Sequence, residues 1–397
     1  MGRPLCKRVL SRLALVAGVS LTGSLAGQER EHLAPIVTAH ATEASPADDA
    51  VRPVVDVMSV PSVFDSNAGS LPNAAYPNSD ACASGGACVP CCPTQCSVPW
   101  YAHRTGGFGE LLYLSAGNSD LIYATEQTGP NPGASPTGPI GVSNIGEHLG
   151  YRVGFSIARS NCSSINFAYT RWDGSTTSVL DATGNNVLNS GVIHPSTSTT
   201  GAASLQATAY QLANFQFADL MLRRVYRASD CGVLNWNAGL RYGNLEQGLS
   251  ADQTISVPTG LTNVNTDIDF NGFGIIGGLD GERHSAQSGL LVYGRAMGSL
   301  LAGDWQADYA QTNQFGGGII ANHYEDFRVT PVVDTELGVG WQSCNGRVRL
   351  TSGYLFSTWF NAVTNRDYIQ SVRDGNLLNM DDNLTFSGLT FRSELRF

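Results

Sequence analysis

Apolar and polar residues alternate with a period of two through much of the chain after residue 106. In 149–158 every odd residue is apolar, from Leu149 to Ile157, and glycine, arginine, serine or alanine stands between them. The same alternation occurs in 233–244, 327–341 and 389–397. Because successive side chains of a strand point to opposite faces, each segment predicts a β-strand with one apolar and one polar face.

Two features favour a membrane barrel over a soluble sandwich, whose strands also alternate. Several segments have about nine to eleven residues, the length with which a tilted strand crosses a bilayer. Aromatic residues such as Trp172, Trp341 and Trp359 stand near strand ends, as in interfacial girdles. The sequence therefore predicts an all-β fold, a transmembrane up-and-down antiparallel β-barrel of about ten strands, with eight or twelve as alternatives. The expected strand cores are 107–115, 149–158, 164–172, 212–226, 233–245, 270–282, 289–301, 326–341, 347–360 and 384–397.

The connections between these strands are expected to alternate between long and short. Tight turns are expected near residues 160, 230, 286 and 345. Outer-membrane barrels carry long loops outside and tight turns on the periplasmic side, so the tight turns and the N-terminal region are expected in the periplasm. The expected long loops are 116–148, 174–210, 246–269, 302–325 and 361–383.

The first 26 residues have the pattern of a secretory signal peptide. A basic stretch between Arg3 and Arg12 precedes an apolar run, and Ser24-Leu25-Ala26 offers small residues for cleavage. A single membrane anchor is the alternative, but the run is too short for a spanning helix. Residues 27–105, rich in proline and then in cysteine, are expected to form a disordered periplasmic tether, and 106–397 the barrel.

The cysteines indicate disulfides rather than a metal site. Cys88-Val-Pro-Cys91 has the spacing of a zinc-binding pair, but no second pair follows closely. An oxidising compartment favours disulfides, although their pairing cannot be read from the sequence. No metal is predicted. The cysteines expected to form disulfides are Cys82, Cys88, Cys91, Cys92, Cys96, Cys162, Cys231 and Cys344.

Composition and motifs exclude several classes of function. The net charge is −10 and only 23 residues are Lys or Arg, which disfavours nucleic acid as a partner. The sequence holds no G-x-S-x-G, H-E-x-x-H or phosphate-binding loop. Some ten-stranded outer-membrane barrels are proteases with Asp and His at the outer rim, but nothing in this sequence pairs such residues. We therefore expect no enzyme and no cofactor. The candidates are three histidines in the expected outer loops, His148, His194 and His323, and three aspartates nearby in the sequence, Asp181, Asp308 and Asp326.

The last strand ends on Phe397, which is the signal by which the barrel-assembly machinery recognises outer-membrane proteins. Together with this residue, the segments Gly107-Phe-Gly-Glu-Leu-Leu-Tyr113, Ala218-Asp219-Leu220 and Asp334-Thr-Glu336-Leu-Gly338 resemble a known family. It is the pore-forming outer-membrane family typified by the Legionella major outer-membrane protein, with cysteine-rich planctomycete versions. The resemblance covers residues 106–397 and implies a barrel with pore or structural activity.

Charges on the polar strand faces are expected to point into the lumen. An unpaired charge in a narrow lumen is costly, so we expect pairing, notably of Asp334 and Glu336 with Arg347 and Arg349 across the turn near Cys344. The predicted lumen charges are Arg152, Arg241, Arg295, Asp334, Glu336, Arg347, Arg349, Arg392 and Glu394.

Two functions remain after these exclusions. One is a small porin-like pore for small solutes or ions. The other is a structural envelope protein with a closed, salt-bridged lumen, anchored by the barrel and cross-linked through the tether to peptidoglycan or other envelope proteins. A barrel of eight strands is nearly filled by side chains, and open channels have about sixteen strands or more. In either case, outer-membrane lipid and the assembly machinery are the expected partners.

Overall fold

The computed structural model describes a set of residues that begins just before the expected barrel. The predicted signal peptide at 1–26 and nearly all of the predicted tether at 27–105 lie outside it. The described residues are 103–129, 134–197, 204–229, 231–255, 261–285, 288–313, 319–343, 345–378 and 380–397.

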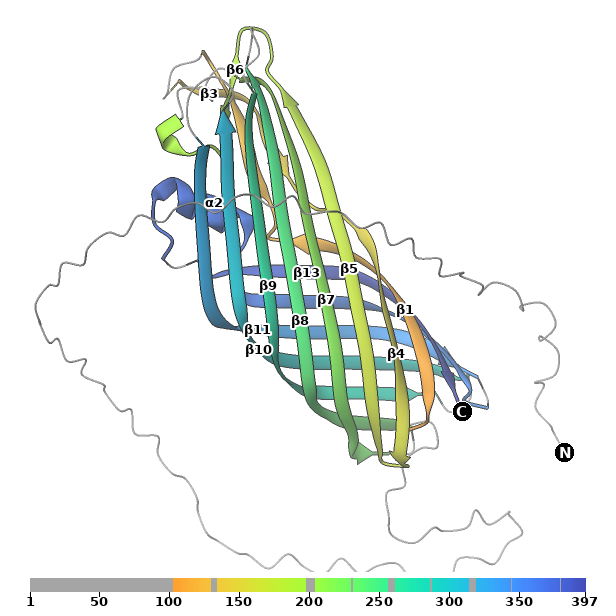
Figure 1. Cartoon of the computed structure of the whole chain (residues 1–397). Coiled ribbons are helices and arrows are strands. Elements are labelled where there is room, and N and C mark those ends of the chain that lie inside the picture. The colour runs from red at the N-terminus through yellow and green to blue at the C-terminus, as the bar shows by residue number, and fades with distance from the viewer. Residues whose placement is uncertain are drawn as a thin grey trace, which may run out of the picture. The chain divides into compact units, whose positions relative to one another are not determined.

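Ten antiparallel strands form a closed ring (Figure 1). The last strand pairs with the first from Gly106–Arg396 to Gly117–Thr385, and this pairing closes the ring. The predicted ten-stranded, all-β architecture is confirmed, and each strand overlaps its expected core. In chain order the ring strands are β1 (Gly106–Gly117), β4 (His148–Ser160), β5 (Ser163–Asp181), β7 (Ser204–Ala228), β8 (Gly232–Ile255), β9 (Leu261–His284), β10 (Leu290–Asn313), β11 (Ile319–Gln342), β12 (Val348–Ala362) and β13 (Asp382–Arg396).

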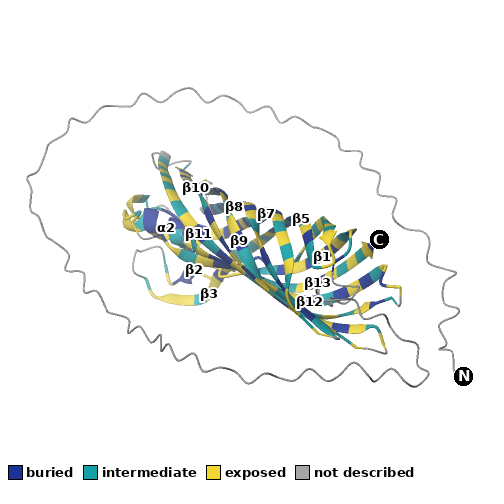
Figure 2. Cartoon of the chain, turned by 90° about the horizontal axis from the view of Figure 1, so that it is seen from below, coloured by how far each residue is buried: buried dark blue, intermediate teal, exposed yellow. Residues whose placement is uncertain are grey.

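The apolar faces of the strands point out of the ring. Leu337 is 72% exposed, whereas the preceding residue, Glu336, is 2% exposed. The same alternation of exposed and buried residues runs along the other ring strands (Figure 2). A soluble sandwich would bury its apolar faces, so this arrangement is that of a barrel with lipid outside.

The two ends of the ring differ in their connections. At one end, called the turn end below, short turns join β4 to β5, β7 to β8, β9 to β10 and β11 to β12. At the other, the loop end, the connections carry further elements (Figure 1). β2 pairs with β3 and β6, and β6 with β7, which extends the sheet to 13 strands. These elements are β2 (Leu121–Gln127), β3 (Pro136–Ser143), β6 (Val187–Ser190), the 3-10 helix η1 (Pro195–Thr197) and α2 (Asn365–Asp374).

Five neighbouring strands, β7 to β11, are longer than expected. Each has 24 or 25 residues, more than twice the about 9–11 with which a strand crosses a bilayer. The prediction of long loops at 246–269 and 302–325 is therefore wrong, because most of both segments continues the strands. In these extensions the apolar side chains, such as Leu249 and Trp305, point inward, and charged side chains such as Asp304 are exposed. This is the reverse of the arrangement near the turn end.

Helix α2 has defined ends. The Thr364 side chain accepts a hydrogen bond from the backbone N–H of Asp367, and Gly375 closes the helix with φ of 64°, a conformation that favours glycine. Among the described residues, no helix combines the length and the apolar character that crossing a membrane requires.

Candidate functional site

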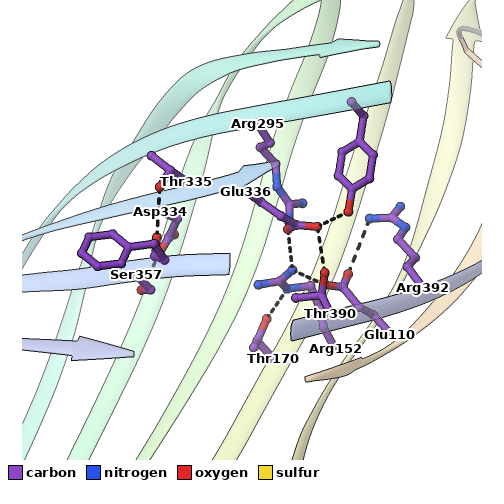
Figure 3. A network of polar contacts seen from close by, with 12 residues as sticks. Glu110, Arg152, Thr170, Arg295, Asp334, Thr335, Glu336, Ser357, Thr390 and Arg392 are labelled. Carbon is purple, nitrogen blue, oxygen red and sulfur yellow. Dashed lines mark hydrogen bonds and ion pairs between the residues drawn. The ribbon is translucent and has the colours of Figure 1, made fainter. Parts of the chain in front are cut away.

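A network of ion pairs joins four strands inside the ring (Figure 3). Arg152 on β4 bonds Glu110 on β1 at 2.7 Å and lies 3.6 Å from Glu336 on β11. Arg295 on β10 pairs with the same Glu336, which also accepts a hydrogen bond from Tyr293 at 2.7 Å. Arg295 stands opposite Glu336 in the β10–β11 ladder, and Glu110 opposite Arg152 in the β1–β4 ladder. The contact between Arg152 and Glu336 links these two ladders across the lumen.

A second cluster centres on Arg241 of β8. Its Nε and Nη2 donate to the two carboxylate oxygens of Asp219 at 2.7 and 3.0 Å, and its Nη1 donates to Asp334 at 2.6 Å. The guanidinium lies 4.1 Å from the centre of the Phe217 ring. Asp219 is on the neighbouring strand β7, but Asp334 is on β11, which does not adjoin β8 in the ring. Arg241 therefore connects β8 to β11 through the lumen, although two strands separate them in the ring.

Further ion pairs fill the interior toward the turn end. Arg349 bonds Glu282 at 2.5 Å, and Arg396 bonds Glu394 at 3.0 Å. Arg223 pairs with Asp280, whose carboxylate also accepts hydrogen bonds from two asparagines. These side chains border a cavity of about 120 Å³ inside the ring.

His103 lies inside the ring at the turn end, just before β1. Nε2 is 3.2 Å from Asn235 Oδ1 and Nδ1 is 3.0 Å from the Ser164 hydroxyl. A neutral imidazole satisfies both contacts, donating to the asparagine oxygen and accepting from serine. Burial, reinforced by the charge of Arg223, lowers the pKa of His103 to about 4.

A layer of aromatic side chains crosses the interior on the loop-end side of the ion pairs. Phe217 and Trp359 stack with ring centres 5.0 Å apart and planes at 12°, and Trp359 meets Phe270 edge-on at 6.0 Å. Phe215 and Phe386 continue the layer at 4.6 Å. Its members come from six ring strands and all are buried. This aromatic layer consists of Trp172, Phe215, Phe217, Phe270, Trp305, Trp359 and Phe386.

The loop-end connections fold inward over the aromatic layer. The Tyr368 hydroxyl of α2 donates to the backbone oxygen of Ala307 at 2.8 Å. Before α2, Val363 O accepts from the Gln247 side chain at 2.7 Å. From the β6–β7 connection, the backbone N–H of His194 donates to Gln311 Oε1 at 2.9 Å. Side chains of the wall thus hold both connections in place.

The structure places eight of the nine predicted lumen charges inside the ring, where each takes part in an ion pair. The exception is Arg347, which lies in the turn before β12 and is exposed. The predicted pairing of Asp334 and Glu336 with Arg347 and Arg349 is also wrong. In the β11–β12 ladder Arg349 stands opposite Gln342, while Glu336 stands opposite Leu355, so the arginines lie several residues nearer the turn end.

The cysteine predictions are only partly within the described residues. Cys231 is a free thiol, so the prediction of a disulfide at this residue is wrong. The carbonyl oxygen of Cys231 accepts a hydrogen bond from the backbone N–H of His284, the last residue of β9. The carbonyl oxygen of Cys162, the other described cysteine, accepts one from the backbone N–H of Val225 on β7. The two cysteines therefore lie in different turns, Cys162 between β4 and β5 and Cys231 between β7 and β8. Cys162 is not a free thiol. The predictions for Cys82, Cys88, Cys91, Cys92, Cys96 and Cys344 lie outside the described residues.

One pair of the candidate enzyme residues does come together. His323 Nδ1 lies 2.7 Å from Asp308 Oδ1, and both side chains are more than half exposed on adjacent strands. The expectation that nothing pairs these residues is corrected here. Asp326 instead pairs with Arg328, and Asp181 accepts from Gln206. Within the described ranges, no three His, Cys, Asp or Glu side chains are grouped as metal ligands.

The sequence reasoning missed His103, the aromatic layer and the inward fold of α2. A signal for the aromatic layer is present in the sequence, because Trp305 occupies an inward strand position within 302–325, which was expected to be a loop. His103 stands alone before the first strand, and no pattern in the sequence sets it apart.

Comparisons with known proteins place this arrangement among outer-membrane proteins. The family model described as Legionella pneumophila major outer membrane protein precursor matches residues 108–397. No curated protein matches the chain. Among solved structures, the Escherichia coli outer membrane protease OmpT is 11% identical with a TM-score of 0.43, and the match covers 74% of this chain and 97% of the protease. The Pseudomonas putida toluene transporter TodX is 9% identical with a TM-score of 0.32, covering 75% and 90%.

Proposed function

This chain belongs to the family of the Legionella pneumophila major outer membrane protein and lies in the outer membrane, and we propose that it acts there as a closed structural barrel of the envelope. The observation that carries the proposal is the aromatic layer. It is made by side chains of the ring strands themselves, so it belongs to the wall rather than to a removable plug. Conduction needs a hydrated path or a chain of polar ligands, and the stacked Phe217 and Trp359 rings offer neither.

The charges beside the aromatic layer support the same proposal. They are neutralised in pairs, and the cavity that they border has a volume of about 120 Å³. Ten strands make a barrel only slightly wider than the eight-stranded barrels that side chains fill. The ion pair of Arg241 with Asp334 connects β8 to β11 across the lumen, over two intervening strands, which suits a rigid anchor in the membrane.

In this proposal the N-terminal region attaches the barrel to the envelope. Its cysteine-rich stretch, Cys82 to Cys96, would form cross-links to neighbouring envelope proteins, and peptidoglycan is the alternative target. The support for this part is the sequence alone, because these residues lie outside the described ranges.

A small pore is the second candidate, and the charged cavity is the observation that favours it. The cavity is lined by both signs of charge, including Arg223, Glu282, Arg392 and Glu394. Lumen charges of this kind set ion selectivity in pores. Passage would require displacement of the aromatic layer and of the α2 connection above it.

Conductance across planar bilayers distinguishes the two candidates. We expect the full-length protein to be silent and the double variant Phe217→Ala/Trp359→Ala to show discrete steps, because two stacked rings are removed from the layer. The matched control is Phe356→Ala, which removes an exposed ring from the outer face of β12, the strand that carries Trp359. This variant should stay silent. Discrete steps from the unmodified protein would refute the closed barrel and support the pore. A silent, folded double variant would show that the aromatic layer is not the seal.

A further inference from the structure

The outer face of the ring is electrically asymmetric between its two ends. At the turn end the exposed charges are arginines, and among the described residues none of these is in an ion pair and no acidic side chain points outward beside them. At the loop end the outward charges on β8 to β11 are mainly acidic. The turn-end arginines are Arg159, Arg224, Arg227, Arg283 and Arg347. The loop-end acidic residues are Glu246, Asp267, Asp269, Asp304, Asp308 and Glu325.

One of these arginines borders a groove on the lipid-facing surface. The groove has a volume of about 780 Å³ and runs across β9 to β13 near the turn end. Arg283 and His284 lie at its polar edge, and Trp341 lines it with 42% of its surface exposed. The remaining wall is mainly apolar, with Leu290, Val292, Val339, Leu350 and Phe391.

We propose that this groove binds one anionic phospholipid of the periplasmic leaflet. The turn end of an outer-membrane barrel faces the periplasm, so the phospholipid headgroups of that leaflet lie at the level of Arg283. A guanidinium bonds phosphate oxygens in pairs, and the apolar wall accommodates an acyl chain. Tryptophan at such a site has its ring in the apolar region and its N–H toward the headgroups.

Charge complementarity selects an anionic lipid over a zwitterionic one. Arg283 has no carboxylate partner among the described residues, so its charge at the edge of the groove is available to the phosphate of a headgroup. A basic side chain near the surface contributes about 1 kcal/mol of attraction to anionic lipid, which corresponds to about a fivefold preference. The acidic loop end has no such attraction for anionic headgroups.

Trp341 reports directly on the groove. The full-length protein is reconstituted in phosphatidylcholine vesicles that contain an equal fraction of either brominated phosphatidylglycerol or brominated phosphatidylcholine. The Trp341 signal is the difference in fluorescence between the protein and its Trp341→Phe variant. We expect about fivefold tighter association of the brominated phosphatidylglycerol with the groove, and near-equal quenching by the two lipids in Arg283→Gln. Arg159→Gln, at the same end on β4 and outside the groove, is the matched control and should keep the preference.

Three outcomes would overturn the proposal. The first is equal quenching of Trp341 by both lipids in the unmodified protein. The second is an equal loss of the phosphatidylglycerol preference in Arg159→Gln and Arg283→Gln, which would show a diffuse attraction to the rim rather than binding at one site. The third concerns salt and needs no variant: at 1 M salt the Debye length falls to about 3 Å, so a phosphatidylglycerol preference that persists unchanged would exclude the ionic contact. Heat-modifiable mobility on gels checks that each variant is folded.

Discussion

Replacing Arg241 with methionine tests whether ion pairs across the lumen hold the barrel together. The change keeps much of the side chain's length but removes the cation between Asp219 and Asp334. These three side chains are 6%, 8% and 13% exposed. In Arg241→Met the Asp219 carboxylate loses both of its bonds to the guanidinium, and Asp334 keeps the hydroxyl of Ser357 at 2.6 Å.

The expected loss of stability comes from the two carboxylates that stay buried without their cation, rather than from the hydrogen bonds that are removed. Taking one partner from a buried ion pair destabilises a protein by about 3–5 kcal/mol, because a charge remains buried without compensation. Two carboxylates share this cation, so we expect the upper part of that range. The exposed pair Arg171–Asp173, whose side chains are 43% and 46% exposed, is the control, since surface ion pairs contribute about 0–1 kcal/mol.

A rescue variant separates charge from packing. Arg241→Met combined with Asp219→Asn and Asp334→Asn leaves no buried charge in the cluster, and should recover most of the lost stability. The assay is urea unfolding of the protein in phospholipid vesicles, followed by tryptophan fluorescence and by heat-modifiable mobility. A stabilising role for this buried cluster is refuted if Arg241→Met lowers the unfolding free energy no more than Arg171→Gln does, or if the triple variant is no more stable than Arg241→Met.

Three further predictions address the outer face, assembly and pH. Leu240 lies between Leu220 and Ile275 on the outer face, so Leu240→Arg should lower the unfolding free energy in lipid by about 2–4 kcal/mol; a near-zero change would contradict the facing. Deletion of Phe397 should leave the protein in the periplasm, and normal heat-modifiable mobility of the deletion variant would count against its role as an assembly signal. The pKa of His103 is lowered by burial from 6.5 to about 4, so folding favours the neutral ring, and its contribution to stability is present above pH 6.5 and is lost as the pH falls toward 4. Stability should therefore fall less between these pH values in His103→Gln, and equal slopes would exclude this role.

The strands could be predicted from the sequence because their signal is local. A period of two over nine residues, as from Leu389 to Phe397, needs no knowledge of the partner strand. The ion pairs could not be predicted, because they depend on how the ring closes. Arg349 meets Glu282 of β9 rather than a residue of its own hairpin, and Arg241 reaches Asp334 over two intervening strands.

Strand β10 shows why the aromatic layer lies where it does. Near the turn end its outward residues, such as Val292 and Leu300, are apolar, and inward Arg295 is charged. Beyond Leu301 the polarity reverses, with Asp304 and Asp308 outward and Trp305 and Tyr309 inward.

The same reversal occurs on β9, between outward Phe273 and outward Asp269. A strand that leaves the bilayer has water on its outer side. Its apolar side chains therefore stabilise the fold only when they are buried inside the ring. The apolar face of each of these strands therefore points outward within the membrane and inward beyond its boundary. The aromatic layer begins at this level because the strands that protrude from the membrane need an apolar core.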